Sequence, residues 1–120
     1  MNTLLFVYGT LKRGCGNHHH LAGQTFAGMA RTQPGYRLYD LGGYPGLVAS
    51  TGEQEGVVGE VWSVDPAALA QLDAFEGVRE GLYRRAPITL QPPFADQAIH
   101  AYLPVAPVTG RRAIGSEWKE

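Results

Sequence analysis

The sequence predicts an α+β fold in which a mixed, curved β-sheet closes into a small barrel with one or two flanking helices. Short runs of β-branched and aromatic residues recur along the chain, whereas a single segment has clear helix start and stop signals. The 120 residues include 16 glycines and 8 prolines, which is typical of many short elements joined by tight turns. Because regular helices do not separate the strands, a doubly wound α/β fold is disfavoured.

Length and composition predict one domain over residues 1–120. Hydrophobic residues at 44% and charged residues at 18% are globular values, which argue against a largely disordered chain. No internal repeat, low-complexity segment or linker-like tract divides the sequence.

Seven segments have the composition of strands. The first is a short apolar run that ends at Gly9, as expected for a buried strand with a sharp exit. The segment Gly42–Gly46 is predicted to be a loop, because three glycines and a proline in five positions disfavour the regular hydrogen bonding of a β-strand. The segment from Thr10 to Gly23 is expected to be a loop, or a loop with a short helix around His18–Ala22. The predicted strands are 4–8, 24–32, 36–41, 47–50, 57–64, 82–90 and 97–103.

One α-helix is predicted, from Pro66 to Glu76. Asp65 is a good N-cap, and Pro66 suits the first helical position. Gly77 follows as a natural C-terminal stop. The predicted buried stripe consists of apolar residues at three-residue steps: Leu69, Leu72 and Phe75.

Charge and hydropathy exclude several classes of protein. A formal net charge of −1 leaves no basic footprint for nucleic acid, so we expect no nucleic-acid partner. No apolar stretch approaches the roughly 20 residues of a membrane span. The N-terminal run Leu4–Val7 is too short for a signal peptide, and the single cysteine cannot form an internal disulfide. We therefore expect a cytoplasmic protein.

Two neighbouring groups of reactive residues are possible sites, the three histidines at 18–20 and Cys15. Adjacent side chains point in different directions, so His18, His19 and His20 are a poor set of ligands for one metal ion. Cys15 lies close to these histidines in sequence, and a nearby imidazole can activate a thiol. A thiol enzyme that uses Cys15 remains an open hypothesis, whereas His100 is predicted to be structural.

The segment after the first strand partly matches a phosphate loop. Gly9 and Gly14 have the required spacing, but the essential lysine and the Ser/Thr after it are missing. A strand that ends in glycine still exposes consecutive backbone N–H groups, which can bind an anion. A carboxylate is as suitable for such a cradle as a phosphate.

Glu76 is the best candidate for acid–base chemistry. It occupies the last turn of the predicted helix, where the helix dipole disfavours a carboxylate. Its neighbours Phe75, Gly77 and Val78 are apolar or small, and both effects raise a carboxyl pKa. A raised pKa suits a general base that later acts as an acid. The alternative is an ordinary exposed helix residue.

Four segments in this order resemble the gamma-glutamylcyclotransferase-like (AIG2-like) family. The resemblance is strongest to its gamma-glutamylamine cyclotransferases and their small bacterial relatives. It extends over nearly the whole chain. The segments are VYGTLKRG at 7–14, GYPG at 43–46, LDAFEG at 72–77 with LYRR at 82–85, and GSEW at 115–118.

The resemblance implies a fold and a reaction. The fold is a mixed, partly closed β-barrel with flanking helices, the gamma-glutamylcyclotransferase-like fold. The reaction is an intramolecular acyl transfer in which the substrate α-amine attacks its own γ-carbonyl. It releases 5-oxoproline and a free amine or amino acid. The resemblance further implies a small γ-glutamyl substrate and no metal or cofactor, and a monomer or small homodimer fits the size of the chain.

The resemblance also implies roles for particular residues. Glu76 becomes the general base and acid. The glutamyl end is held by the loop residues Tyr8, Gly9, Thr10 and Leu11. For Tyr44, Pro45, Tyr83 and Tyr102, both substrate contact and simple packing remain open. A non-catalytic protein of the same fold that binds small carboxylates is the alternative function. Few residues follow Tyr102, so we expect an open pocket on the leaving-group side.

Overall fold

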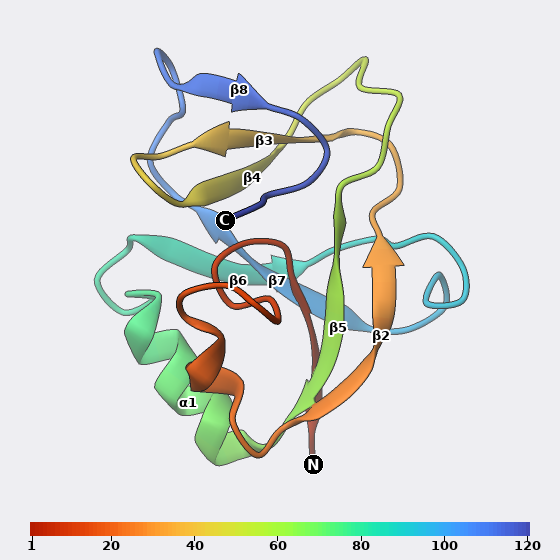
Figure 1. Cartoon of the computed structure of the whole chain (residues 1–120), viewed down its shortest axis with the longest axis vertical. Helices are drawn as coiled ribbons and strands as arrows, with labels where there is room; N and C mark the ends of the chain where they lie inside the picture. The colour runs from red at the N-terminus through yellow and green to blue at the C-terminus, as the bar shows by residue number, and fades with distance from the viewer.

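Eight strands form two sheets in the computed structural model, which describes residues 1–120 (Figure 1). The larger sheet has the order β2-β5-β1-β7-β6 and the smaller one the order β4-β3-β8. The larger sheet contains β1 (Thr3–Val7), β2 (Thr25–Arg31), β5 (Val58–Val64), β6 (Tyr83–Pro87) and β7 (Ile99–Pro104). The smaller sheet contains β3 (Tyr36–Asp40), β4 (Pro45–Ala49) and β8 (Arg112–Ile114). No helix is long and apolar enough to cross a membrane.

Strand β1 lies at the centre of the larger sheet, antiparallel to β5 and parallel to β7. Its alternate side chains enter two different hydrophobic clusters. Leu5 and Val7 pack on the side of helix α1 (Pro66–Phe75), whereas Phe6 and the following Tyr8 pack on the other side. A central strand buried on both faces explains the unbroken apolar run in the sequence.

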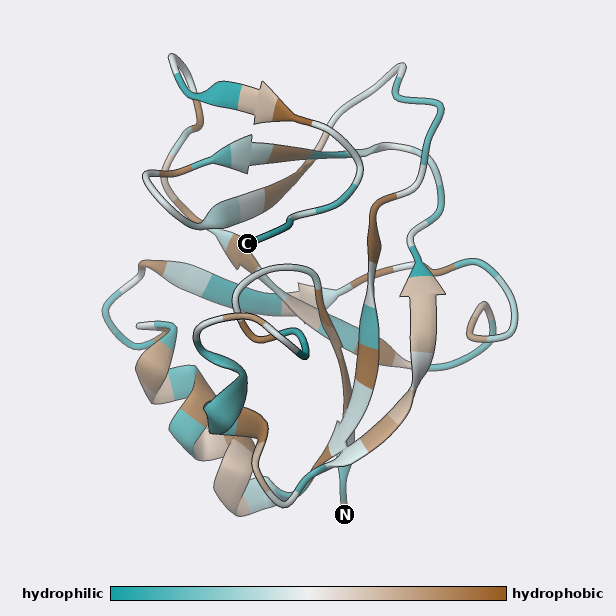
Figure 2. Cartoon of the chain, viewed as in Figure 1, coloured by the Kyte–Doolittle hydropathy of each residue, from teal (hydrophilic) through white to brown (hydrophobic).

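The hydrophobic clusters lie on opposite faces of the larger sheet. The cluster under α1 contains Leu11, Leu21, Trp62 and Leu72, and the second cluster lies towards the smaller sheet. In Figure 2, α1 alternates hydrophobic and hydrophilic bands, as expected for a helix with one side against a sheet. Strand β1 contributes side chains to both clusters.

The predicted closed barrel is wrong. Beyond β2 and β6 the two edges of the sheet meet only at an isolated bridge between Thr32 and Leu90. The sheet therefore curves until its edges touch at one end but does not close. Pro87 ends β6, and Pro92 and Pro93 follow in the connection to β7. Prolines have no N–H to donate, so the pairing of this connection with the end of β2 is limited to the short stretch around Leu90.

Two sequence-based assignments in the smaller sheet also need correction. The segment Gly42–Gly46 is not entirely loop, because Pro45 and Gly46 begin β4 and pair with β3. Strand β4 is an edge strand, and a proline is tolerated at the first residue of such a strand. Strand β8, at Arg112–Ile114, has only three residues and was missed. It exists because β3 offers it a long-range partner.

Helix α1 begins as predicted. The Asp65 carboxylate accepts a hydrogen bond from the backbone N–H of Ala68 at 2.7 Å, which caps the first turn. Leu72 and Ala68 are its buried residues, but Phe75 is 44% exposed, so the prediction that Phe75 belongs to the buried stripe is wrong. Phe75 ends the helix and covers a pocket instead of the sheet. The expected short helix is a 3₁₀ turn, η1 (His18–Leu21), which contacts α1.

Candidate active site

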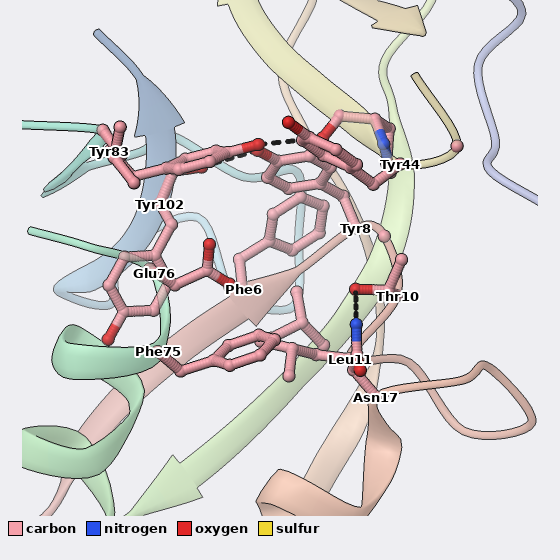
Figure 3. A pocket seen from close by; sticks show the side chains of 15 residues that line it. Phe6, Tyr8, Thr10, Leu11, Asn17, Tyr44, Phe75, Glu76, Tyr83 and Tyr102 are labelled. Carbon is pink, nitrogen blue, oxygen red and sulfur yellow. Dashed lines mark hydrogen bonds between the residues drawn. The ribbon is translucent and has the colours of Figure 1, made fainter. Parts of the chain in front are cut away.

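A pocket of about 340 Å³ lies where β1 ends, next to the C-terminal end of α1 (Figure 3). Its volume is within the range of small-molecule sites. All nine residues predicted for the site line this pocket, although they come from five separate stretches of the chain. They are Glu76, Tyr8, Gly9, Thr10, Leu11, Tyr44, Pro45, Tyr83 and Tyr102.

The end of α1 determines where Glu76 points. The N–H of Gly77 donates to the carbonyl of Ala74, and the N–H of Val78 donates to that of Asp73. This is a Schellman motif, and it requires Gly77 in the left-handed region, at φ +68°. A Cβ on Gly77 would also lie 2.7 Å from Leu82 Cδ1. The motif ends the helix at Glu76, whose carboxyl group points into the pocket (Figure 3).

Burial raises the pKa of Glu76 from its ordinary value of 4.5 to about 7. The carboxyl group forms no hydrogen bond or ion pair with the protein, and aromatic side chains surround it in Figure 3. Burial is therefore the cause of the raised pKa, in agreement with the predicted direction. A carboxyl group with this pKa is populated in both protonation states near neutral pH, as proton transfer in both directions requires.

The raised pKa of Glu76 predicts a pH dependence of stability. Between pH 4.5 and about pH 7 the folded chain binds more protons at this site than the unfolded chain. The free energy of unfolding should therefore fall as the pH rises through this range, by up to ~3 kcal/mol. Glu76→Gln should lack this fall. Denaturant titrations of both proteins across the range test the prediction, and parallel curves would contradict it.

The loop after β1 leaves four consecutive backbone donors free. The N–H groups of Tyr8, Gly9, Thr10 and Leu11 donate to no acceptor in the protein. Asn17 holds the loop from behind, because its side chain donates to Thr10 Oγ1 at 3.0 Å and its N–H donates to the Thr10 carbonyl at 2.9 Å. No lysine, arginine or histidine lines the pocket, so these backbone groups are its candidate anion site.

Gly9 allows this loop to approach β4. A Cβ at position 9 would lie 2.6 Å from Pro45 Cγ and 3.0 Å from Pro45 Cδ. No side chain can occupy that space unless the loop or β4 shifts. The close approach of Gly9 to Pro45 therefore fixes the distance between the free N–H groups and the opposite wall.

Four tyrosines line the pocket, and three of their hydroxyls bind the protein itself. Tyr8 donates to the Tyr102 carbonyl at 2.6 Å and accepts from a backbone N–H of β4 at 3.3 Å. Tyr83 donates to the carbonyl of Pro45 at 3.5 Å. Burial raises the pKa of both phenols, so neither is a base near neutral pH. Only Tyr44, which is 45% exposed, has a hydroxyl without a protein partner.

Tyr102 is held by a charged pair outside the pocket. Its hydroxyl donates to Asp73 Oδ1 at 2.6 Å, and burial together with this hydrogen bond raises its pKa. Arg85 donates to both oxygens of Asp73, from Nε at 3.0 Å and from Nη2 at 3.3 Å. The ring of Tyr102 therefore faces the pocket while its hydroxyl is turned towards α1. Asp73 was not predicted as a site residue, and its position one helical turn before Glu76 was the available signal.

Sequence reasoning missed several lining residues. Nothing in the sequence around Asn17 indicates a role at the site, because that role depends on the fold of the loop, which brings Asn17 beside Thr10. Phe75 was assigned to the helix core, and Leu82 to a strand. The remaining unpredicted lining residues are Phe6, Val7 and Gly43.

The three histidines at 18–20 and Cys15 do not line the pocket. His18 Nδ1 makes a hydrogen bond with the Leu11 carbonyl at 2.9 Å, whereas His19 and His20 stack on each other. No group of His, Cys, Asp or Glu side chains is placed to hold a metal ion. Burial raises the pKa of Cys15, the opposite of what a thiol nucleophile needs. This geometry disfavours the thiol hypothesis.

Comparison with known proteins agrees with the predicted family. A family model described as "Gamma-glutamyl cyclotransferase, AIG2-like" matches residues 5–120. The chain belongs to the gamma-glutamylcyclotransferase family. A Vibrio cholerae relative named "Putative gamma-glutamylcyclotransferase" is 46% identical over 102 residues, which cover 85% of this chain and 84% of the relative.

Two further comparisons support membership of the gamma-glutamylcyclotransferase family. The family protein YtfP of Escherichia coli K12 is 38% identical over 115 residues, covering 95% of this chain and 94% of YtfP. The crystal structure of an AIG2-like protein from Mus musculus superposes with a TM-score of 0.79 at 29% identity, covering 96% of this chain and 87% of that one. Sequence and fold therefore indicate the same family.

The motif segments of this gamma-glutamylcyclotransferase-family chain converge in space. Segments 7–14, 43–46, 72–77 and 82–85 each contribute lining residues to the pocket. Segment 115–118 does not, and no residue after Tyr102 lines the pocket. Instead, the Trp118 carbonyl accepts a hydrogen bond from Lys12 Nζ at 2.5 Å, which ties the C-terminal segment to the loop after β1.

Proposed function

We propose that this protein is a gamma-glutamyl cyclotransferase that releases 5-oxoproline from a small γ-glutamyl compound. One observation supports the proposal most strongly. A carboxyl group with a pKa of about 7 and no protein partner shares a pocket with four free backbone N–H groups. The carboxyl group can transfer protons, and the N–H groups can bind a carboxylate. Cyclisation of a γ-glutamyl compound requires both functions.

The N–H groups of Tyr8–Leu11 bind the substrate α-carboxylate. Because the α-amine is bonded to the same carbon as that carboxylate, binding the anion also places the amine inside the pocket. The chain from the α-carbon to the γ-carbonyl can then fold into a five-membered ring. Holding this near-attack geometry is itself a large part of the acceleration in intramolecular reactions.

Glu76 moves one proton in two steps. Its carboxylate first takes a proton from the α-ammonium group, which frees the nitrogen lone pair. A bond forms between the α-nitrogen and the γ-carbon. The protonated Glu76 then gives its proton to the leaving nitrogen, the bond from the γ-carbon to that nitrogen breaks, and Glu76 returns to its carboxylate state. The ring nitrogen still carries one proton too many for a lactam, and this second proton passes to the released amine, which leaves as an ammonium ion. The nucleophile belongs to the substrate, so the protein needs no serine or cysteine at the site.

The test is a panel of γ-glutamyl amides and γ-glutamyl amino acids incubated with the purified protein. We expect 5-oxoproline and the free amine in equal amounts, measured by mass spectrometry. If no compound in the panel releases 5-oxoproline, the proposal is wrong. In that case calorimetric binding of small carboxylates without chemical change would favour the alternative, a carboxylate-binding protein with the same pocket.

A further inference from the structure

We propose that Glu60 positions the loop that presents the four free N–H groups to the substrate. Glu60 lies in β5 and does not line the pocket, so it acts through the loop and does not touch the substrate. This inference rests on the proposed function, in which these N–H groups bind the substrate α-carboxylate. It adds a positioning residue that lies outside the motif segments and outside the pocket lining.

Glu60 is a buried carboxylate in the middle of a strand. It is 4% exposed, which is less than any other acidic residue of the protein. A carboxylate in such a place is costly unless hydrogen bonds compensate for the lost water. The groups that bind it therefore indicate why it is there.

Three hydrogen bonds satisfy the Glu60 carboxylate. Oε1 accepts from the backbone N–H of Arg13 at 3.1 Å and from Trp62 Nε1 at 3.0 Å, and Oε2 accepts from Arg13 Nε at 3.2 Å. Trp62 packs against the ring of Phe26, and the Arg13 guanidinium lies 3.8 Å from the centroid of that ring. The indole of Trp62 therefore holds the carboxylate in one orientation, in which Oε1 faces the backbone of Arg13.

Glu60 holds both ends of the loop after β1. Its backbone pairs with Val7, the last residue of β1, and its side chain binds the N–H of Arg13 just after the loop. The segment 8–12 lies between these two attachments and includes the free N–H groups of Tyr8–Leu11. Because one residue of β5 fixes both ends, it determines the curvature of the segment and the direction of its N–H groups.

The hydrogen bond to the backbone of Arg13, and not the ion pair, is the contact that holds the loop. The Arg13 side chain is 47% exposed, and an ion pair open to water contributes little. A neutral side chain with one well-placed oxygen should therefore be sufficient. Glutamine has such an oxygen, because its amide carbonyl can accept both hydrogen bonds of Oε1. Methionine has a similar length but no oxygen.

Direct binding of two matched ligands tests the inference without turnover. 5-Oxoproline has a carboxylate, whereas its amide, 5-oxoprolinamide, is neutral at the same position. Calorimetry gives the ratio of the two affinities, and the wild-type protein should prefer 5-oxoproline. Glu60→Met should reduce this ratio by about 10-fold, because the N–H groups lose their common direction, whereas Glu60→Gln should stay within about two-fold of the wild-type ratio.

Ile88→Val is the matched control for a general loss of stability. Ile88 is 6% exposed, packs in the cluster on the other face of the sheet and does not line the pocket. This variant should keep the wild-type ratio. An unchanged ratio in Glu60→Met would overturn the inference, as would an equal loss in Glu60→Gln or in Ile88→Val. A wild-type protein without preference for the carboxylate would overturn it too.

Hydrogen exchange in the wild-type protein decides the matter if Glu60→Met does not fold. Followed by NMR, the amide of Arg13 should exchange slowly, and the amides of Tyr8–Leu11 should become slower to exchange when 5-oxoproline binds. Rapid exchange at Arg13, or no protection of the loop amides, would overturn the inference. Release of 5-oxoproline from the substrate panel is measured separately, and its absence would overturn the proposed function.

Discussion

Replacing Glu76 by glutamine is expected to lower kcat for 5-oxoproline release by about 10²–10⁴-fold, the usual contribution of a positioned general base. Glutamine keeps the size of the side chain but cannot accept the proton of the α-ammonium group. The KM should change little, because the free N–H groups of Tyr8–Leu11 are retained. Steady-state kinetics on the best substrate of the panel measures both constants.

Two controls make the Glu76 result specific. In the wild-type protein kcat/KM should rise with pH until about pH 7 if Glu76 is the base, and the residual activity of the variant should lack that rise. Cys15→Ala should retain full activity, because Cys15 is not a lining residue. Full activity in Glu76→Gln would disprove the catalytic role, and loss of activity in Cys15→Ala would revive the thiol hypothesis.

Gly9→Ala is expected to reduce kcat/KM by about 10²-fold, the cost of a displacement of about 1 Å in a positioned site. The added Cβ would lie 2.6 Å from Pro45 Cγ, so the loop and β4 must separate. This moves the free N–H groups of the loop, which we propose bind the glutamyl end, away from their present place in the pocket. Kinetics on the same substrate gives the ratio.

The fall in kcat/KM of Gly9→Ala should come from the lack of space at position 9, and not from the loss of a glycine as such. Gly115→Ala is the matched control, since a Cβ there has nothing within 4 Å and Gly115 does not have positive φ. It should behave like the wild-type protein. Adding Pro45→Ala to Gly9→Ala removes the two ring atoms in conflict and should recover part of the activity. A double variant as impaired as Gly9→Ala would show that the contact with Pro45 is not the cause.

Local signals were sufficient for much of the fold. The cap at Asp65 and the stop at Gly77 delimit α1, because capping depends only on side chains within a few residues of the helix end. The apolar run of β1 predicted a buried strand for a similarly local reason. The closed barrel was wrong because closure depends on whether two distant edges can pair. That depends on the prolines between β6 and β7 together with the curvature of the sheet.

The residues predicted for the site line one pocket, whereas several contacts around them could not be predicted. The motif residues Tyr8–Leu11 and Glu76 could be chosen because each combines a backbone or helix-end feature with a chemical group. Asn17 and Asp73 could not, since neither has a function until the chain brings Thr10 and Tyr102 beside it. Phe75 was assigned to the buried stripe although it lies beyond the sheet, because periodicity cannot tell where the supporting sheet ends.

Sequence alone was sufficient for the family, for the positions of most strands along the chain, for the ends of the helix and for the choice of the candidate acid–base residue. These features depend on residues that are neighbours in the chain or belong to a recognisable motif. The three-dimensional arrangement was needed to show that the sheet stays open, that Gly9 abuts Pro45 and that Phe75 and Leu82 line the pocket. The raised pKa of Glu76 depends on both the local sequence and the tertiary structure. The direction of the shift follows from the local sequence. Its value of about 7 comes from burial, to which side chains distant in sequence contribute.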